Sequence, residues 1–148
     1  MSKKKERPAP ESMGLACVGV DTHAHLDMDP FDQDLDQVLA RARASGVSHI
    51  GNVFLGPEAY SNGKERFDGV DGIFFILGIH PHDAKLHSEA RGAAMFQAFK
   101  EDPRLKGFGE TGLDYHYDFS PRDVQRKAFR DQLAMAKELD VPAVIHSR

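Results

Sequence analysis

The sequence has few of the features that mark secreted or membrane-bound proteins. It contains one cysteine, Cys17, among 148 residues, which excludes an internal disulfide and fits a reducing compartment. Its longest apolar run, residues 73–77, is far shorter than the roughly 20 residues of a membrane-spanning helix. The basic start is followed by no apolar stretch of signal-peptide length. We therefore expect a cytoplasmic protein with no membrane contact.

An excess of basic charge is also lacking. Lysine and arginine number 19 against 23 acidic residues, and the net charge of −4 argues against bulk attraction to nucleic acid, although a local basic site stays open. The 41% hydrophobic and 28% charged residues exclude wholesale disorder, and the length suits one domain. No glycine-rich phosphate loop, serine nucleophile elbow or CxxC pair is present, so P-loop hydrolysis of nucleotides and covalent serine chemistry lack support.

Apolar runs and helix patterns alternate along most of the chain. Residues 1–14 carry three consecutive lysines and no apolar periodicity, which predicts a flexible basic tail. Beyond them the patterns predict strands at 16–22, 48–55, 73–79, 105–109 and 143–145, and helices at 34–45, 56–67, 88–101 and from 120 to Pro142. Repeated units of strand and helix indicate a parallel sheet with right-handed crossovers, either doubly wound or a barrel.

Capping residues define the ends of two predicted helices. Gly46 stands where the first helix needs a C-terminal glycine. Ser120 is expected to cap the last helix and Pro121 to be its first residue. Ala128 and Leu133 are expected on the apolar face of that helix.

The strongest chemical signal follows the first predicted strand. His23 and His25 are two residues apart, so in a strand both imidazoles point to one side and offer half the coordination sphere of a divalent metal. Asp21 and Asp27 flank the pair and are expected to orient the imidazoles. The alternative is a pair of histidines held only by hydrogen bonds.

Metal-competent side chains recur at the ends of the later strands, at His80, His82, Glu110, Asp114 and His146. Because the carboxyl ends of parallel strands meet at one edge, these residues are expected to become neighbours. Glu110 and His146 are expected to bind metal, and His80 to contact substrate. Arg148 follows the last of them and is expected to meet an anionic substrate.

Glu110 is the residue expected to be catalytic. It stands between Gly109 and Gly112, and glycines beside an acid permit close approach of the backbone to a ligand. A carboxylate can bridge two ions, and a mixture of imidazole and carboxylate ligands indicates hydrolysis by metal-activated water. The alternative is a capping or salt-bridging acid on a loop.

Five further residues carry weaker signals. His82 is expected to be a loop or N-cap residue, and His49, at the start of the second strand, to be structural. His87 and His116 carry no signal that separates them from solvated histidines. Cys17 is expected to pack inside the first strand.

The chain contains four distinctive short strings: VDTHAHLD, GIHPHD, GETGLDY and VPAVIHSR. Gln125 and Phe129 precede the last of them. Together these residues resemble the TatD-type metal-dependent deoxyribonucleases. The resemblance implies an α/β fold, a parallel β/α barrel of the TIM or amidohydrolase-like type. Residues 15–148 would be its N-terminal portion, with roughly five strands and four helices. The resemblance also implies two divalent ions and hydrolysis of phosphodiester bonds in DNA, often from the 3′ end.

The motif matches also imply a role for each site residue. His23 and His25 would hold the first ion, Glu110 would bridge, His146 would hold the second, and His80 matches the substrate-side histidine. Mg, Mn and Zn all accept such mixed ligands. The family's later ligands, a histidine and an aspartate, would lie beyond position 148, so the sequence resembles the N-terminal part of a family member.

Two other functions stay open at this stage. One is a metal-dependent amide or ester hydrolase, because such barrels serve several electrophiles. The other is a non-catalytic part-barrel whose exposed strand edges pair with another chain. With DNA as the substrate, no stable protein partner is expected.

Overall fold

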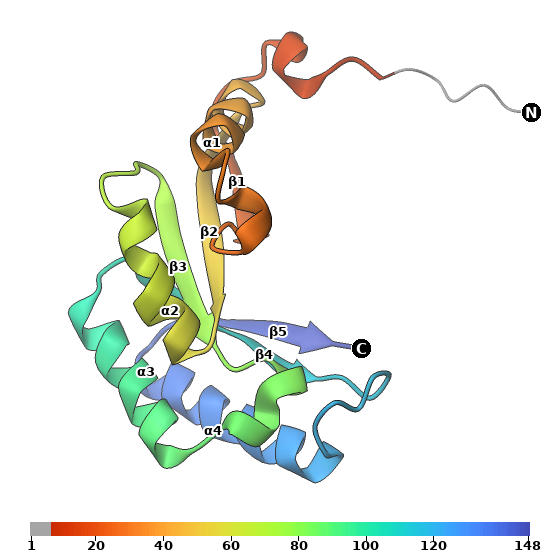
Figure 1. Ribbon diagram of the computed structural model, residues 1–148, viewed down its shortest axis with the longest axis vertical. Helices are drawn as coiled ribbons and strands as arrows, with labels where there is room; N and C mark the ends of the chain where they lie inside the picture. The colour runs from red at the N-terminus through yellow and green to blue at the C-terminus, as the bar shows by residue number, and fades with distance from the viewer. Residues whose placement is uncertain (1–6) are drawn as a thin grey trace, which may run out of the picture.

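Five short strands form one parallel sheet in the computed structural model, which describes residues 7–148. They are β1 (Gly19–Ala24), β2 (Val47–Leu55), β3 (Ile73–Gly78), β4 (Leu105–Leu113) and β5 (Ala143–Ser147). Each strand pairs in parallel with the next along the chain, in the order β1-β2-β3-β4-β5. The sheet curls (Figure 1), so the sequential parallel strands form part of a barrel, as predicted.

The crossovers between the strands contain α1 (Leu35–Ala44), α2 (Pro57–Gly63), α3 (Glu89–Glu101) and α4 (Arg122–Glu138). Short 3-10 helices complete the described elements: η1 (Pro10–Met13), η2 (Asp29–Phe31), η3 (Lys64–Phe67) and η4 (Pro81–Leu86). In Figure 1, α2, α3 and α4 lie on the outer side of the curled sheet. Within residues 7–148, no helix is both long enough and apolar enough to cross a bilayer.

The start of the chain differs from its predicted structure. Cys17 is exposed and precedes β1, which begins at Gly19, so the prediction that its side chain packs inside a strand is wrong. Pro10–Met13 form a 3-10 turn within the predicted tail. The consecutive lysines at positions 3 to 5 lie outside the described residues.

The last helix also begins later than expected. Pro121 has extended backbone angles, φ −54° and ψ 141°, and is the N-cap of α4 rather than its first residue. The Ser120 hydroxyl does not cap the helix, because it donates to the His82 carbonyl oxygen at 2.7 Å and accepts the Lys85 N–H at 3.2 Å. The serine therefore ties η4 to the start of α4. Leu133, expected on the apolar face, is 36% exposed.

Aromatic side chains fill the space between the sheet and the helices. Phe54 of β2 and Phe75 of β3 are fully buried and meet edge to face with ring centroids 5.1 Å apart. Tyr60 and Phe67 pack edge to face against both rings. Such pairs contribute roughly 0.5–1.5 kcal/mol each beyond their burial. The core is therefore apolar on the side of the sheet that the helices cover.

A polar network stands at the amino-terminal end of β4. The Tyr60 hydroxyl donates to Asp102 Oδ2 at 2.9 Å, and Arg104 donates to both carboxylate oxygens through Nε and Nη2. Burial raises the pKa of Asp102, but the hydrogen bonds from Arg104 outweigh it and hold that pKa below its ordinary value. Arg104 also contacts Asp68, at 2.8 Å, on the exposed side.

Replacing the buried acid is expected to destabilise the fold. Asp102→Asn should lower the free energy of unfolding at pH 7 by about 1–3 kcal/mol, because hydrogen bonds to a charged group are lost. The folded pKa is below the unfolded one, so the contribution is present above roughly pH 4 and is lost as the pH falls through the folded pKa. The difference between wild type and variant should therefore shrink in acid, in urea titrations at several pH values.

The matched control is Asp68→Asn, which removes the exposed partner of the same arginine. Exposed pairs contribute about 0–1 kcal/mol, so this variant should stay close to wild type. Equal destabilisation by both variants would contradict the conclusion that the buried Asp102 contributes more to stability than the exposed Asp68.

Candidate metal centre

The carboxyl ends of the strands bring six metal-competent side chains into two clusters. Cluster A contains His23 and His25 of β1 and Glu110 of β4. Cluster B is made by the triad His80, His82 and His146, from the β3 exit, η4 and β5. In each cluster the three potential ligand atoms lie within 4.8 Å of one another. The predicted convergence of residues far apart in the sequence is thus present.

Glu110 lies between the two clusters. Its Oε2 is 3.1 Å from His23 Nε2, and its Oε1 is 2.8 Å from His146 Nδ1 and 3.9 Å from His80 Nε2. Burial raises the pKa of Glu110, but the hydrogen bond to His146 and the neighbouring imidazoles outweigh it and bring that pKa below its ordinary value. The side chain is therefore an ionised carboxylate with one oxygen directed at each cluster.

His25 is oriented by the backbone of the neighbouring strand. Its Nδ1–H donates to the Val53 carbonyl oxygen at 2.9 Å, which leaves the lone pair on Nε2. Metal-binding histidines commonly donate their second ring N–H in this way. The partner is a carbonyl group, not one of the flanking aspartates that were expected to orient the ring.

Those aspartates accept hydrogen bonds from a backbone N–H and from the side chain of Asn52 instead. Asp21 Oδ1 accepts the backbone N–H of His23 at 3.0 Å, and Asp27 accepts from the Asn52 amide at 3.0 Å. The fully buried Asn52 also accepts the Leu26 N–H at 2.6 Å. No hydrogen bond joins either aspartate to an imidazole in the described structure. Their contribution is to fix the β1 exit, on which both histidines stand.

Asp114 connects two histidines of cluster B. Its Oδ2 accepts from His82 Nε2 at 2.7 Å and from His146 Nε2 at 3.2 Å. Burial of this carboxyl raises its pKa, but hydrogen bonds from the Tyr117 and His116 backbone and from both imidazoles hold that pKa far below its ordinary value. His82, expected only in a loop or N-cap role, therefore lies within the site. The N-cap of η4 is His80, whose Nδ1 accepts the His82 N–H at 3.2 Å.

The hydrogen-bond partners leave a mismatch that a cation would relieve. His146 has a carboxylate oxygen at each ring nitrogen, Glu110 Oε1 at 2.8 Å from Nδ1 and Asp114 Oδ2 at 3.2 Å from Nε2, but a neutral imidazole has only one N–H to donate. Two acceptors at this separation repel unless a proton or a metal ion lies with them. Burial lowers the pKa of His80 to about 4, so that neighbour brings no positive charge at pH 7. The donor set fits a divalent ion.

Two buried glutamines of α4 hold the strand exits in place. Gln132 Oε1 accepts the Ile79 N–H at 2.7 Å and its Nε2 donates to the Ile79 carbonyl at 3.1 Å. Gln125 does the same for Asp114, at 2.8 and 3.0 Å. Both side chains are 1% exposed. Gln132 was not anticipated, and its only signal in the sequence is its position seven residues after Gln125, on the same helix face.

The glycines beside Glu110 serve strand packing. A Cβ on Gly112, where φ is +153°, would overlap the carbonyl oxygen of His146 on β5. A Cβ on Gly78 would lie 2.6 Å from the Cα of Gly109 on the next strand. Gly109 and Gly112 therefore permit close contact between neighbouring strand backbones, and the approach of a ligand beside Glu110 stays a prediction.

The remaining histidines lie outside both clusters. His49 is exposed on β2 and contacts Ser48 at 2.9 Å. His87, expected to be solvated, has a side chain only 10% exposed and contacts Asp131 at 3.1 Å, so that expectation is wrong. His116 packs edge-on against Tyr117 in the β4–α4 connection.

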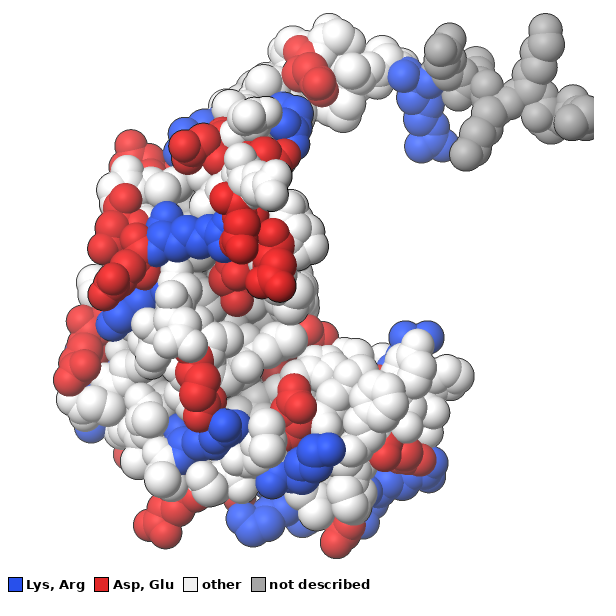
Figure 2. Space-filling view, viewed as in Figure 1, with Lys and Arg blue, Asp and Glu red and all other residues white. Residues whose placement is uncertain are grey.

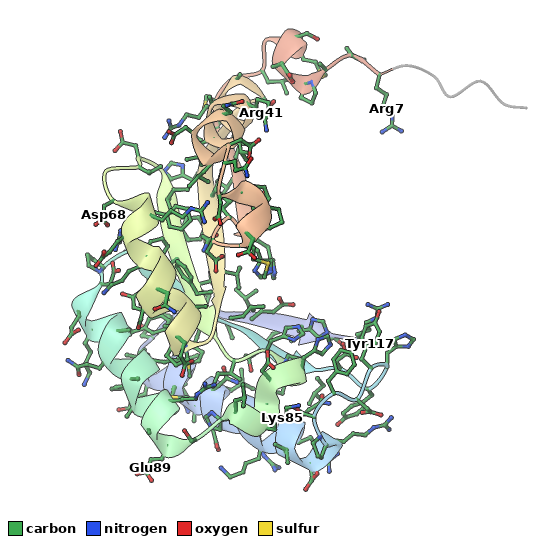
Figure 3. All side chains as sticks on the ribbon, in the orientation of Figure 1. Arg7, Arg41, Asp68, Lys85, Glu89 and Tyr117 are labelled. Carbon is green, nitrogen blue, oxygen red and sulfur yellow. The ribbon has the colours of Figure 1, made fainter. Side chains whose placement is uncertain are left out.

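Charge is mixed over the visible surface. Figure 2 shows acidic and basic side chains interspersed, with no large basic patch on that face. The Arg148 guanidinium lies 4.8 Å from the centre of the Tyr117 ring. Figure 3 shows Tyr117 beside the carboxyl end of β5.

The chain matches the family model described as TatD related DNase over residues 20–148. It is 38% identical over 128 residues to the uncharacterized metal-dependent hydrolase YabD of Bacillus subtilis (strain 168), covering 86% of this chain and 50% of that protein. It is 36% identical over 131 residues to the 3′-5′ ssDNA/RNA exonuclease TatD of Klebsiella pneumoniae (strain 342), covering 86% and 48%. The chain thus spans about half the length of these relatives.

Solved structures agree in fold. The TatD homologue YjjV of Escherichia coli K12 superposes with a TM-score of 0.81 at 30% identity, over 89% of this chain and 51% of that one. A TatD family hydrolase of Entamoeba histolytica has a TM-score of 0.74 at 22% identity, over 90% and 51%.

Divalent metal is expected to stabilise the folded chain. At 100 times the dissociation constant, Zn²⁺ or Mn²⁺ should raise Tm by about 5–10 °C, because an ion that binds only the folded state adds about 2.7 kcal/mol. Glu110→Gln should reduce this shift, and the exposed His49→Ala should not, in thermal melts of metal-stripped protein. An unchanged shift in Glu110→Gln would place the bound ion elsewhere.

Proposed function

Because the chain belongs to the TatD related DNase family, which its residues 20–148 match, we propose that it carries the metal site of a hydrolase that cleaves phosphodiester bonds in DNA. The observation that carries the proposal is Glu110, an ionised carboxylate between two imidazole clusters at the carboxyl edge of a parallel sheet. The names of two relatives, a metal-dependent hydrolase and an ssDNA/RNA exonuclease, support the same chemistry.

We assign His23 and His25 to one ion, His146 to a second, and Glu110 to both. The donor set fits, since imidazole nitrogens and carboxylate oxygens of this kind accept Mg, Mn or Zn. Two such ions, when bound, lower the pKa of bound water and neutralise charge on the attacking and leaving oxygens.

The chain's own residues then have separate tasks. Glu110 is the proposed catalytic carboxylate, because its two oxygens already face the two clusters. Asp114 fixes the His82 and His146 rings through Nε2. His80 has a pKa of about 4 through burial, so at pH 7 it is a neutral ring. Its Nδ1 accepts a backbone N–H, so Nε2 carries the proton; that nitrogen lies 3.1 Å from His146 Nδ1, and we propose that it donates instead to a substrate oxygen when His146 binds metal.

Arg148 is the proposed contact for an anionic group of the substrate. It follows His146 by two residues, and its backbone pairs with β4 through Leu113 and Tyr115. Its backbone is therefore held next to β4, and its exposed guanidinium lies over the Tyr117 ring, 4.8 Å from the ring centre. A guanidinium offers a planar fork of donors that suits phosphate oxygens.

The proposal is tested by removing one residue from the site. In this chain, or in a longer polypeptide that contains it, Glu110→Gln or His23→Ala should lower the rate of hydrolysis of single-stranded DNA by at least about 100-fold. Loss of a hydrogen-bond partner of a metal ligand typically lowers metal affinity or activity 10- to 100-fold, so loss of a ligand itself should have at least the larger effect. Release of nucleotides with Mn²⁺ or Mg²⁺ present is the measurement.

His49→Ala is the matched control, because it removes an exposed histidine outside both clusters. A panel of small amides and carboxylic esters, assayed in parallel, separates phosphodiester hydrolysis from the rival chemistry. Full activity in Glu110→Gln, or turnover of amides alone, would refute the proposal.

A further inference from the structure

Two exposed aromatic rings lie in the connection between β4 and α4. Tyr117 is 45% and Phe119 58% exposed. The rings are stacked, with centroids 5.3 Å apart and planes inclined by 17°. We name Tyr117 and Phe119 the aromatic platform. Water-exposed stacked rings of this kind leave apolar faces available to a flat partner.

The aromatic platform adjoins cluster B directly. The His82 ring packs edge-on with Phe119 at a centroid distance of 4.7 Å and with Tyr117 at 5.6 Å. His82 in turn lies 6.0 Å from the His146 ring. A flat group that stacked on the platform would therefore lie next to the candidate metal centre.

The loop that carries the rings is held in place by its own hydrogen bonds. Asp114 Oδ1 accepts the backbone N–H groups of His116 and Tyr117, each at 3.0 Å. Arg122 of α4 donates to both carboxylate oxygens of Asp118, the residue between the two rings. The rings are thus presented by an ordered segment, so a partner that stacks on them need not order the loop.

A positive charge completes the surface. The Arg148 guanidinium lies over the Tyr117 ring, 4.8 Å from its centre, and no acidic side chain is paired with it in the described structure. Phe119 is therefore the more open ring of the platform. A nucleotide combines the two features that this surface matches, a π-face for the rings and a phosphate for the guanidinium.

We propose that the aromatic platform stacks an unpaired nucleobase of the substrate while Arg148 contacts the adjoining phosphate. The inference rests on the proposed function and adds the residues that select the substrate. In a duplex, both faces of an internal base are covered by its neighbours, so only a single strand or a frayed end can use the platform. Every base has a π-face, and stacking therefore selects strandedness and not sequence.

Binding without metal tests the inference separately from hydrolysis. Fluorescence anisotropy in EDTA compares a short single-stranded oligothymidylate with an abasic strand of the same length and charge. The wild-type chain should bind the thymidylate more tightly. In Tyr117→Ala/Phe119→Ala this preference should fall by about 5- to 150-fold, which corresponds to the ~1–3 kcal/mol that stacking contributes per base.

Three variants act as controls. Tyr117→Phe keeps a stacking ring and should retain the preference. Leu133→Ala removes an exposed apolar side chain from α4 and should also bind as wild type does. Arg148→Ala should weaken both strands equally and reduce the slope of log K against log salt by about 0.7, the value for one lost phosphate contact on a single strand.

The outcomes separate this inference from the proposed function. Base preference without any hydrolysis would support the platform and contradict the nuclease. Hydrolysis without base preference, or no binding of either strand, would overturn the platform. A lower Tm in the double variant with unchanged base preference would overturn it too, since the rings would then serve packing within the chain.

Discussion

Parallel pairing of each strand with the next is the constraint on which the site depends. It places every carboxyl end at one edge, so residues separated by up to 123 positions, from His23 to His146, become neighbours. The opposite end of the sheet has a different task. There, Asp102 and Arg104 form a network with Tyr60 beside the aromatic core. The polar groups that stabilise the fold therefore lie at the amino-terminal end of the strands, and those of the candidate site lie at the carboxyl end.

Helix α4 supports the carboxyl ends of the strands. Its buried glutamines satisfy the backbone of Ile79 and Asp114, just where β3 and β4 end. Buried backbone groups at such irregular strand exits need partners, and the amide supplies both a donor and an acceptor. Next to these two strand ends lie His80, which follows Ile79, and Asp114 itself, and both belong to the site. The outer helix thus controls geometry on the inner side of the sheet.

The sequence predicts the order of elements well because apolar runs and helical spacing are local properties. It also predicts that the strand-end residues meet, since this follows from parallel topology. It fails where an interaction joins distant segments. The sequence suggests that Ser120 caps a helix, but its hydroxyl donates to the His82 carbonyl oxygen. It gives no sign that His87 is shielded, but the side chain is only 10% exposed and contacts Asp131. Hydrophobic periodicity favours Leu133 over Gln132 as the inward residue, although the amide is the one that is buried.

The contact between His23 and Glu110 has a consequence for the shape of the sheet. β1 and β4 are not neighbours, because β2 and β3 stand between them. The 3.1 Å contact therefore joins two strands that the order of the sheet separates by two others. A ligand bound to cluster A would set the distance between His23 and Glu110. An ion held by cluster A would therefore also fix the separation of β1 and β4, and with it the curvature of the sheet between them.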